Sequence, residues 1–181
     1  MGNYNFMSIR KHRTALLALT LIALLLFAFS SLTLVKTQDR NLKYHLPASL
    51  QRQVVEDSEG MSEVQIIDYS LKLTARTLRF NADNDIPNGT ANCIGYAQLC
   101  ASVCNRALAS NGYRCRAKPV VGYVEVFGIN LCDVLVDVVP SRRWKNFVSN
   151  HDFVELACQG KTYYFDPSMY DVLDNKCLTT K

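Results

Sequence analysis

The sequence lacks internal repeats, and it has no low-complexity tract outside one apolar run near its start. Nothing in it therefore indicates a repeat architecture. Its 181 residues are the length of a single domain, because one hydrophobic core commonly serves ~100 to 200 residues. A second domain is not expected.

Charged residues are missing from residues 14–35, a run of 22 that follows a basic cluster at residues 10–13. A helix needs roughly 20 apolar residues to cross a membrane, and a buried soluble helix would show a polar face. We therefore predict residues 1–35 to be a retained transmembrane anchor or a cleaved signal peptide, with Ala28 and Ser30 as small residues near the cleavage site. In both cases the basic flank stays in the cytoplasm, so the remaining chain is expected on the extracytoplasmic side of the membrane, or secreted.

A basic surface of the kind that binds nucleic acid is also missing. Three of the 20 Lys and Arg residues precede residue 36, which leaves 17 against all 16 Asp and Glu residues. The exported part is therefore nearly neutral and shows no basic stripe, so a nucleic-acid partner is not expected.

The chain has seven cysteines but no metal-binding spacing. Cys100 and Cys104 form one close pair without a second, so a zinc site is not predicted. An exported domain can keep disulfides, and if one thiol is reserved for chemistry, the other six allow fifteen pairings that the sequence cannot rank. The alternative for several of them is a small, buried, unpaired side chain.

The exported part begins with a polar, irregular stretch at residues 36–60, which we expect to be a linker, and continues as one domain over residues 61–181. Ser62 and Gln65 form a capping box for a helix whose apolar residues recur at helical spacing up to Leu78. Turn-forming residues fill 81–90, and a second helix is expected from Cys93 to Asn111-Gly112.

After Gly112 the sequence changes to alternating, β-branched segments. We expect strands at about 115–123, 130–139, 153–158 and 162–166, with a tight turn at 159–161. Helices first and an antiparallel sheet afterwards indicate an α+β fold.

Cys93 lies in the first turn of the second helix, directly after the turn-rich loop. Free backbone N–H groups and the positive end of the helix dipole stabilise a thiolate there, and the same groups can receive an oxyanion. A cysteine that only packs beneath the loop is the alternative.

Histidine is scarce, and His151 is the one histidine after the linker, which contains His45. Thiol catalysis needs a base, and no other histidine of the predicted domain can serve. Asp166 ends an aromatic strand, and a hairpin turning at 159–161 would face residues 151–157 with 162–168, which brings His151 beside Asp166. A carboxylate there would fix the imidazole tautomer, so the three residues have the order of a Cys-His-Asp triad.

Four segments with these residues resemble the core of the transglutaminase-like superfamily, which has a papain-like fold. They are Asn92-Cys-Ile-Gly-Tyr-Ala-Gln98, Leu108-Ala-Ser-Asn-Gly-Tyr-Arg-Cys-Arg116 with Val121-Gly-Tyr123, His151-Asp-Phe-Val-Glu155, and Tyr164-Phe-Asp-Pro-Ser168.

The resemblance covers roughly residues 62–172 and implies that Cys93 is the nucleophile, His151 the general base and acid, and Asp166 the orienting carboxylate. Members of this superfamily often have tryptophan two residues after the histidine, whereas this chain has Phe153. No residue upstream of Cys93 can be assigned as a side-chain oxyanion donor.

The sequence therefore predicts an acyl-transfer enzyme acting on a peptide or protein substrate, without a metal or organic cofactor. Hydrolysis of amide bonds is favoured over transfer to an amine, as in a cross-linking transglutaminase. The alternatives are a binding or scaffold domain that keeps the fold without turnover, and a disulfide-stapled recognition module in which Cys93 would be paired.

Overall fold

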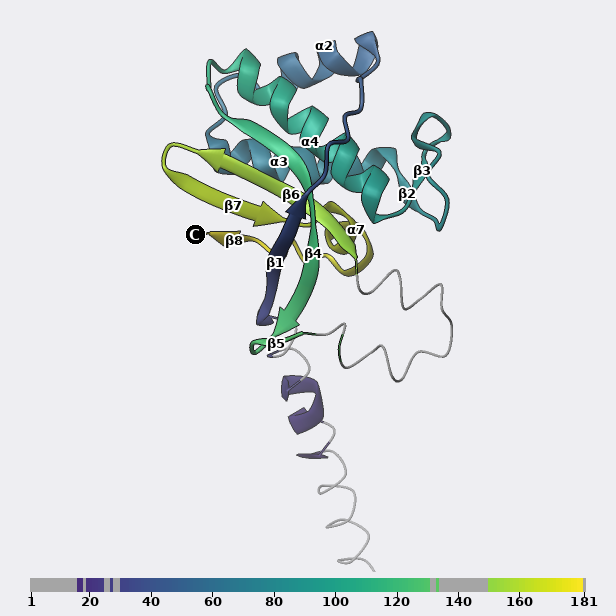
Figure 1. Ribbon diagram of the computed structural model, residues 1–181, viewed down its shortest axis with the longest axis vertical. Helices are drawn as coiled ribbons and strands as arrows, with labels where there is room; N and C mark the ends of the chain where they lie inside the picture. The colour runs from purple at the N-terminus through teal and green to yellow at the C-terminus, as the bar shows by residue number, and fades with distance from the viewer. Residues whose placement is uncertain are drawn as a thin grey trace, which may run out of the picture.

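The chain is α+β: helices cover one face of a curled antiparallel sheet (Figure 1). The computed structural model describes residues 16–17, 19–24, 27, 30–130, 133 and 150–180. Within these residues the strand order of the main sheet is β1-β4-β6-β7-β8, and β5 pairs with β4 beside this path. The strands are β1 (Leu32–Asp39), β4 (Arg116–Val126), β5 (Ile129–Asn130), β6 (His151–Cys158), β7 (Lys161–Phe165) and β8 (Thr179–Thr180).

Helix α4 (Cys93–Ser110) lies against β4 and β6, while α2 (Ala48–Asp57) and α3 (Glu63–Thr77) pack on α4. The short helix α7 (Pro167–Leu173) follows β7 and contacts α3 and α4. Between α3 and α4 the chain forms a small separate sheet and a 3-10 turn. These elements are β2 (Arg79–Phe80), η1 (Ile86–Asn88) and β3 (Thr90–Ala91).

Several predicted elements are confirmed. The backbone N–H of Ser62 donates to Gln65 Oε1 at 2.8 Å at the start of α3, as the capping box predicted. The tight turn between β6 and β7 is made by Gln159 and Gly160, both with positive φ, which matches the twist of a hairpin. The strand expected at 130–139 lies almost entirely outside the described residues.

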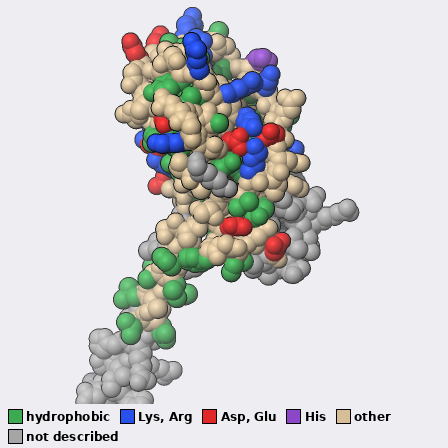
Figure 2. Space-filling view, turned by 60° about the vertical axis from the view of Figure 1, so that its left-hand side comes forward, with side chains coloured by type: hydrophobic (Ala, Val, Ile, Leu, Met, Phe, Trp, Pro, Cys, Tyr) green, Lys and Arg blue, Asp and Glu red, His purple; other side chains and the backbone are tan. Residues whose placement is uncertain are grey.

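The predicted N-terminal transmembrane helix is wrong. No helix in the part of the chain that the structure describes is long and apolar enough to cross a membrane. The last residues of the apolar run, from Leu32 onward, belong to β1 and pair with β4. Hydropathy alone did not separate this strand from the helical residues before it, whose large apolar side chains are exposed (Figure 2).

The irregular linker expected at residues 36–60 is not what the structure has. This stretch contains the end of β1 and the whole of α2, and its side chains Leu46 and Val54 are buried in the main core. Because α2 is mostly polar, its single fully buried residue gave little periodicity to detect.

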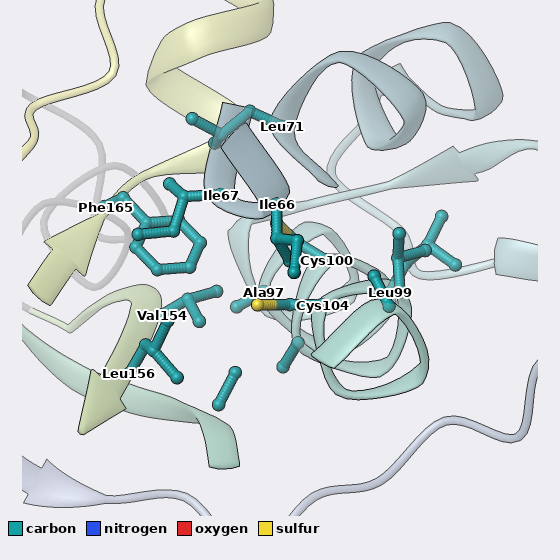
Figure 3. Packing of buried hydrophobic residues seen from close by; sticks show 14 of the residues in the cluster. Ile66, Ile67, Leu71, Ala97, Leu99, Cys100, Cys104, Val154, Leu156 and Phe165 are labelled. Carbon is teal, nitrogen blue, oxygen red and sulfur yellow. The ribbon is translucent and has the colours of Figure 1, made fainter. Parts of the chain in front are cut away.

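The main core lies between the helices and the sheet (Figure 3). Ile66 of α3 points toward Cys100 and Cys104 of α4, Ile67 and Leu71 of α3 belong to the same cluster, and residues of β6 and β7 close the other side. The buried sheet residues shown are Val154, Leu156 and Phe165. Residues far apart in the sequence thereby fix the start of α4 relative to β6.

Gly122 permits the close approach of β1 to the middle of β4. A Cβ atom on Gly122 would lie 1.9 Å from the carbonyl oxygen of Val35, so no larger residue fits without a shift of backbone. The β1–β4 register is irregular here, between Lys36 and Gln38, and Gly122 pairs on its other side with His151. The absence of a side chain at Gly122 therefore allows β1 and the start of β6 to pair with β4 at the same point.

Candidate active site

Cys93 is the first residue of α4, as predicted. Asn92 is the N-cap, and its side chain accepts a hydrogen bond from the N–H of Ile94 at 3.0 Å. Asn84 Oδ1 in turn accepts from the N–H of Asn92 at 2.9 Å, which ties the preceding loop to the helix start. The N–H of Cys93 donates to none of the described residues, so this group is available to a ligand.

Gly95 lets the loop pack directly on the first turn of α4. A Cβ atom at this position would lie 2.6 Å from Ala91 Cβ and 2.8 Å from Asn84 Oδ1. Cys93 is only 4% exposed, so a substrate must approach it along a defined path.

The β6–β7 hairpin brings His151 and Asp166 together in the way that the predicted register implied. Val154 pairs with Phe165, and Cys158 with Lys161, so His151 and Asp166 lie near the open end of the hairpin. The His151 Nε2 atom is hydrogen-bonded to Asp166 Oδ2. Both residues are buried, and Asp166 is fully so.

A further set of hydrogen bonds holds the Asp166 carboxylate in place. Its Oδ1 atom accepts hydrogen bonds from the N–H groups of Ser168 and Met169, at 2.9 and 3.0 Å, and from the Ser168 hydroxyl at 2.8 Å. Asp166 is thus the N-cap of α7, and Pro167 after it suits the first position of a helix. The cap fixes the carboxylate plane and leaves Oδ2 for the imidazole.

Cys93 interacts with the same imidazole. Burial by itself lowers the pKa of His151, but four effects outweigh it: the charge of Asp166, the hydrogen bond to Asp166, the hydrogen bond to Cys93 and the charge of Cys93. The pKa of His151 therefore lies well above its ordinary value. Since Nε2 is used by Asp166, the ring nitrogen left for Cys93 is Nδ1.

The pKa of Asp166 shifts in the opposite direction, downward. Burial raises its pKa, but the charge and hydrogen bond of His151, with the hydrogen bonds from Met169 and Ser168, lower it below the ordinary aspartate value. The two shifts together favour an imidazolium that is hydrogen-bonded to the Asp166 carboxylate and has Cys93 as its other neighbour.

Phe153 stands at the position where the superfamily that the sequence resembles often has tryptophan. Its ring centroid lies 6.4 Å from that of His151, with the planes tilted by 31°. Phe153 is fully buried. An aromatic side chain therefore still packs beside the imidazole, although it provides no N–H donor.

The other free cysteines of the described chain are Cys100, Cys104 and Cys177. Burial raises the pKa of Cys100 well above its ordinary value and that of Cys104 to about 12. Burial, with the charge of Asp166, raises the pKa of Cys177 to about 12 as well. These thiols are therefore poor nucleophiles.

A disulfide joins Cys115 to Cys158, at facing ends of β4 and β6. Cys93 carries a free thiol. The stapled recognition module considered above, which requires a paired Cys93, therefore disagrees with the structure. No group of three or more His, Cys, Asp or Glu side chains suited to a metal ion occurs among the described residues.

Sequence reasoning missed Arg40 and Asp152. Arg40 Nε donates to Asp152 Oδ1 at 2.8 Å and Nη2 to Oδ2 at 3.2 Å, while its backbone N–H donates to Pro119 O. Asp152 is fully buried beside His151, and its hydrogen bonds raise the pKa of Arg40, with a smaller electrostatic contribution from the nearby Cys93. Arg40 stood in the expected linker, so its sequence context gave no signal.

No protein family model, curated protein or solved structure matches this chain. Its function is therefore inferred from the residues of the site.

Proposed function

We propose that this chain is a thiol-dependent acyl-transfer enzyme of the transglutaminase-like type, which hydrolyses amide bonds in a peptide or protein. Cys93 is the nucleophile, His151 the general base and acid, and Asp166 the orienting carboxylate. The observation that carries the proposal is one buried imidazole that interacts with Asp166 through Nε2 and with a thiol at the start of a helix.

The chemistry follows from these positions. His151 takes the thiol proton, and the Cys93 thiolate attacks the carbonyl carbon of the amide. The N–H of Cys93, at the positive end of α4, is a donor for the oxygen that becomes negative. His151 then protonates the leaving amine, and water attacks the thioester, which releases the acid and restores the thiol.

The Cys115–Cys158 disulfide supports action outside the cytoplasm, because disulfides persist in oxidising compartments. A binding domain without turnover would have no need of an activated thiol, and the fit of all three roles favours an enzyme.

Alkylation of the full-length protein tests the proposal. A small excess of iodoacetamide is applied from pH 4 to pH 9, and mass spectrometry locates the modified cysteines. We expect Cys93 to react rapidly at pH 6, with His151→Ala slowing the reaction and Cys93→Ala abolishing it. Cys100, Cys104 and Cys177 provide internal controls, because burial raises the pKa of each of these three thiols and so keeps them in the unreactive protonated form.

A reaction at Cys93 no faster than that of a free thiol would contradict the proposal. The second step is tested with p-nitrophenyl acetate: an acetyl thioester on Cys93 that decays in water supports hydrolysis, whereas decay only with an added primary amine supports transfer to amines.

A further inference from the structure

A basic hollow runs beside the candidate active site. Two adjoining cavities, of about 420 and 310 Å3, share Lys43, Ser102, Asn105 and Arg116 in their walls. Together they form a groove between residues 39–46, the outer face of α4 and the start of β4. We call it the cationic cleft, and its Lys and Arg residues are Arg40, Lys43, Arg106, Arg116 and Lys118.

Two of these five cations are already neutralised. Arg40 is paired with Asp152, and Lys118 with Glu155 at 3.0 Å and with Asp39 at 2.9 Å. Asp39 is the one acidic residue among those that line the cleft, and Lys36 also holds it at 2.6 Å. No negative charge of the cleft is therefore left over for the other cations.

Lys43, Arg106 and Arg116 are exposed and make no ion pair with the described residues. Lys and Arg side chains also gather on the upper part of the face in Figure 2. The polar groups of the floor are occupied: the Asn105 amide binds both backbone groups of Ala117, and the Ser102 hydroxyl binds carbonyl oxygens. Lys43, Arg106 and Arg116 are therefore the cations of the cleft that are available to bind an anion.

The cleft lies along the same helix that begins with the nucleophile. Its wall on α4 runs from Gln98 to Ala109, and α4 begins at Cys93. At a rise of about 1.5 Å per residue, the wall starts roughly 8 Å from the helix start and is about 16 Å long. An extended chain advances about 3.3 Å per residue, so this length suits about five residues of peptide.

We propose that the cationic cleft binds an acidic stretch of the peptide substrate, a few residues from the bond that Cys93 attacks. This inference rests on the proposed function, since it names the substrate class for the same site. Carboxylates of the peptide bind Lys43, Arg106 and Arg116, while Arg40 joins the cleft to the catalytic end.

Fluorescence anisotropy tests the binding separately from catalysis. The full-length Cys93→Ser protein is titrated into fluorescein-labelled Glu-Glu-Gly-Glu-Glu and into the matching Gln-Gln-Gly-Gln-Gln. Exposed ion pairs each contribute a factor of about 1.5 to 5, so three of them should make the acidic peptide bind about tenfold more tightly. This preference should shrink as salt is raised.

Two triple variants with the same change in net charge make the test specific. Lys43→Glu, Arg106→Glu and Arg116→Glu should remove the preference for the acidic peptide. The control, Arg52→Glu, Arg76→Glu and Lys161→Glu, alters exposed cations that do not line the cleft and should retain it. If the first variant does not fold, the same three residues changed to Gln should still weaken the acidic peptide severalfold.

Equal affinity for the two peptides, equal loss in both triple variants, or tighter binding of a five-residue thymidine oligonucleotide would overturn the inference. Alkylation of Cys93 by uncharged iodoacetamide distinguishes a failure of this inference from a failure of the proposed function. A slow wild-type thiol would refute the enzyme whatever the peptides do, whereas a fast thiol without a peptide preference would refute only the cleft.

Discussion

Replacing Asp166 with Asn changes the charge of the site and little else. Asn is as good an N-cap as Asp, so its Oδ1 can keep the hydrogen bonds from Ser168 and Met169. The amide NH2 then points at His151 Nε2, where the wild-type protein has a carboxylate oxygen. Nε2 must accept a hydrogen bond instead of donating one, which puts the imidazole proton on Nδ1.

That tautomer cannot take a proton from Cys93. General base catalysis contributes about 10²- to 10⁴-fold, so we expect alkylation of Cys93 at pH 6 to slow by at least about 10²-fold in Asp166→Asn. The rate is measured with iodoacetamide by quantifying the Cys93 peptide. Asp166→Ala loses the helix cap as well as the charge. Comparing its alkylation rate with that of Asp166→Asn therefore separates the effect of the cap from the effect of the charge.

The same substitution lowers stability in a defined pH window. The pKa of Asp166 is lowered by folding, so its contribution is present above about pH 3.9 and is lost as pH falls through the folded value. The pKa of His151 is raised, so its contribution is complete below about pH 6.5 and is lost as pH rises through the folded value. Between these limits, leaving one member of a buried ion pair unpaired costs about 3 to 5 kcal/mol.

Urea unfolding at pH 5.5 should therefore show a difference of that size between wild type and Asp166→Asn, and the difference should shrink at higher pH as His151 loses its proton. An alkylation rate equal to the wild-type rate would show that Asp166 does not orient the base. An unchanged stability at pH 5.5 would show that the buried ion pair does not form.

Three further predictions concern the scaffold. Replacing Cys115 and Cys158 together by Ser should lower the free energy of unfolding by about 4 kcal/mol, because the disulfide closes a loop of 43 residues in the unfolded chain; urea unfolding with and without reductant measures it. Gly122→Ala should cost about 1 to 3 kcal/mol or more, because β1 must move away from the new methyl group, and an unchanged melting temperature would contradict this packing. Deleting residues 1–57 should abolish cooperative thermal unfolding, whereas deleting residues 1–30 should preserve it, because only the first deletion removes β1 and α2.

The parts of the fold that sequence predicted well are governed by local signals. Ser62 with Gln65 determines the start of α3, and the turn at Gln159-Gly160 determines the β6–β7 register. Once that register is known, the proximity of His151 and Asp166 follows from counting residues along two strands.

The parts that were missed depend on distant contacts. Residues 32–35 pair with β4, yet their composition, Leu-Thr-Leu-Val, is not distinguishable from that of the helical residues before them. Arg40 has no local pattern at all, because its partner Asp152 lies 112 residues later. The sequence could not rank the fifteen possible pairings of six cysteines, whereas the β4–β6 register places Cys115 opposite Cys158.

The first strand connects these observations to the site. Gly122 allows β1 to lie close to β4 at the point where β4 also pairs with His151. Arg40, directly after β1, binds Asp152 next to that histidine. The carboxylate of Asp152 is buried, and burial raises its pKa in spite of the Arg40 guanidinium. Removing Arg40 would leave that carboxylate without its cation, so Asp152 would take up a proton or move, and β6 would shift at His151. β1 and the residue that follows it thus act on the candidate active site through backbone pairing with β4 and through the Arg40–Asp152 ion pair, although neither contributes a residue to the triad.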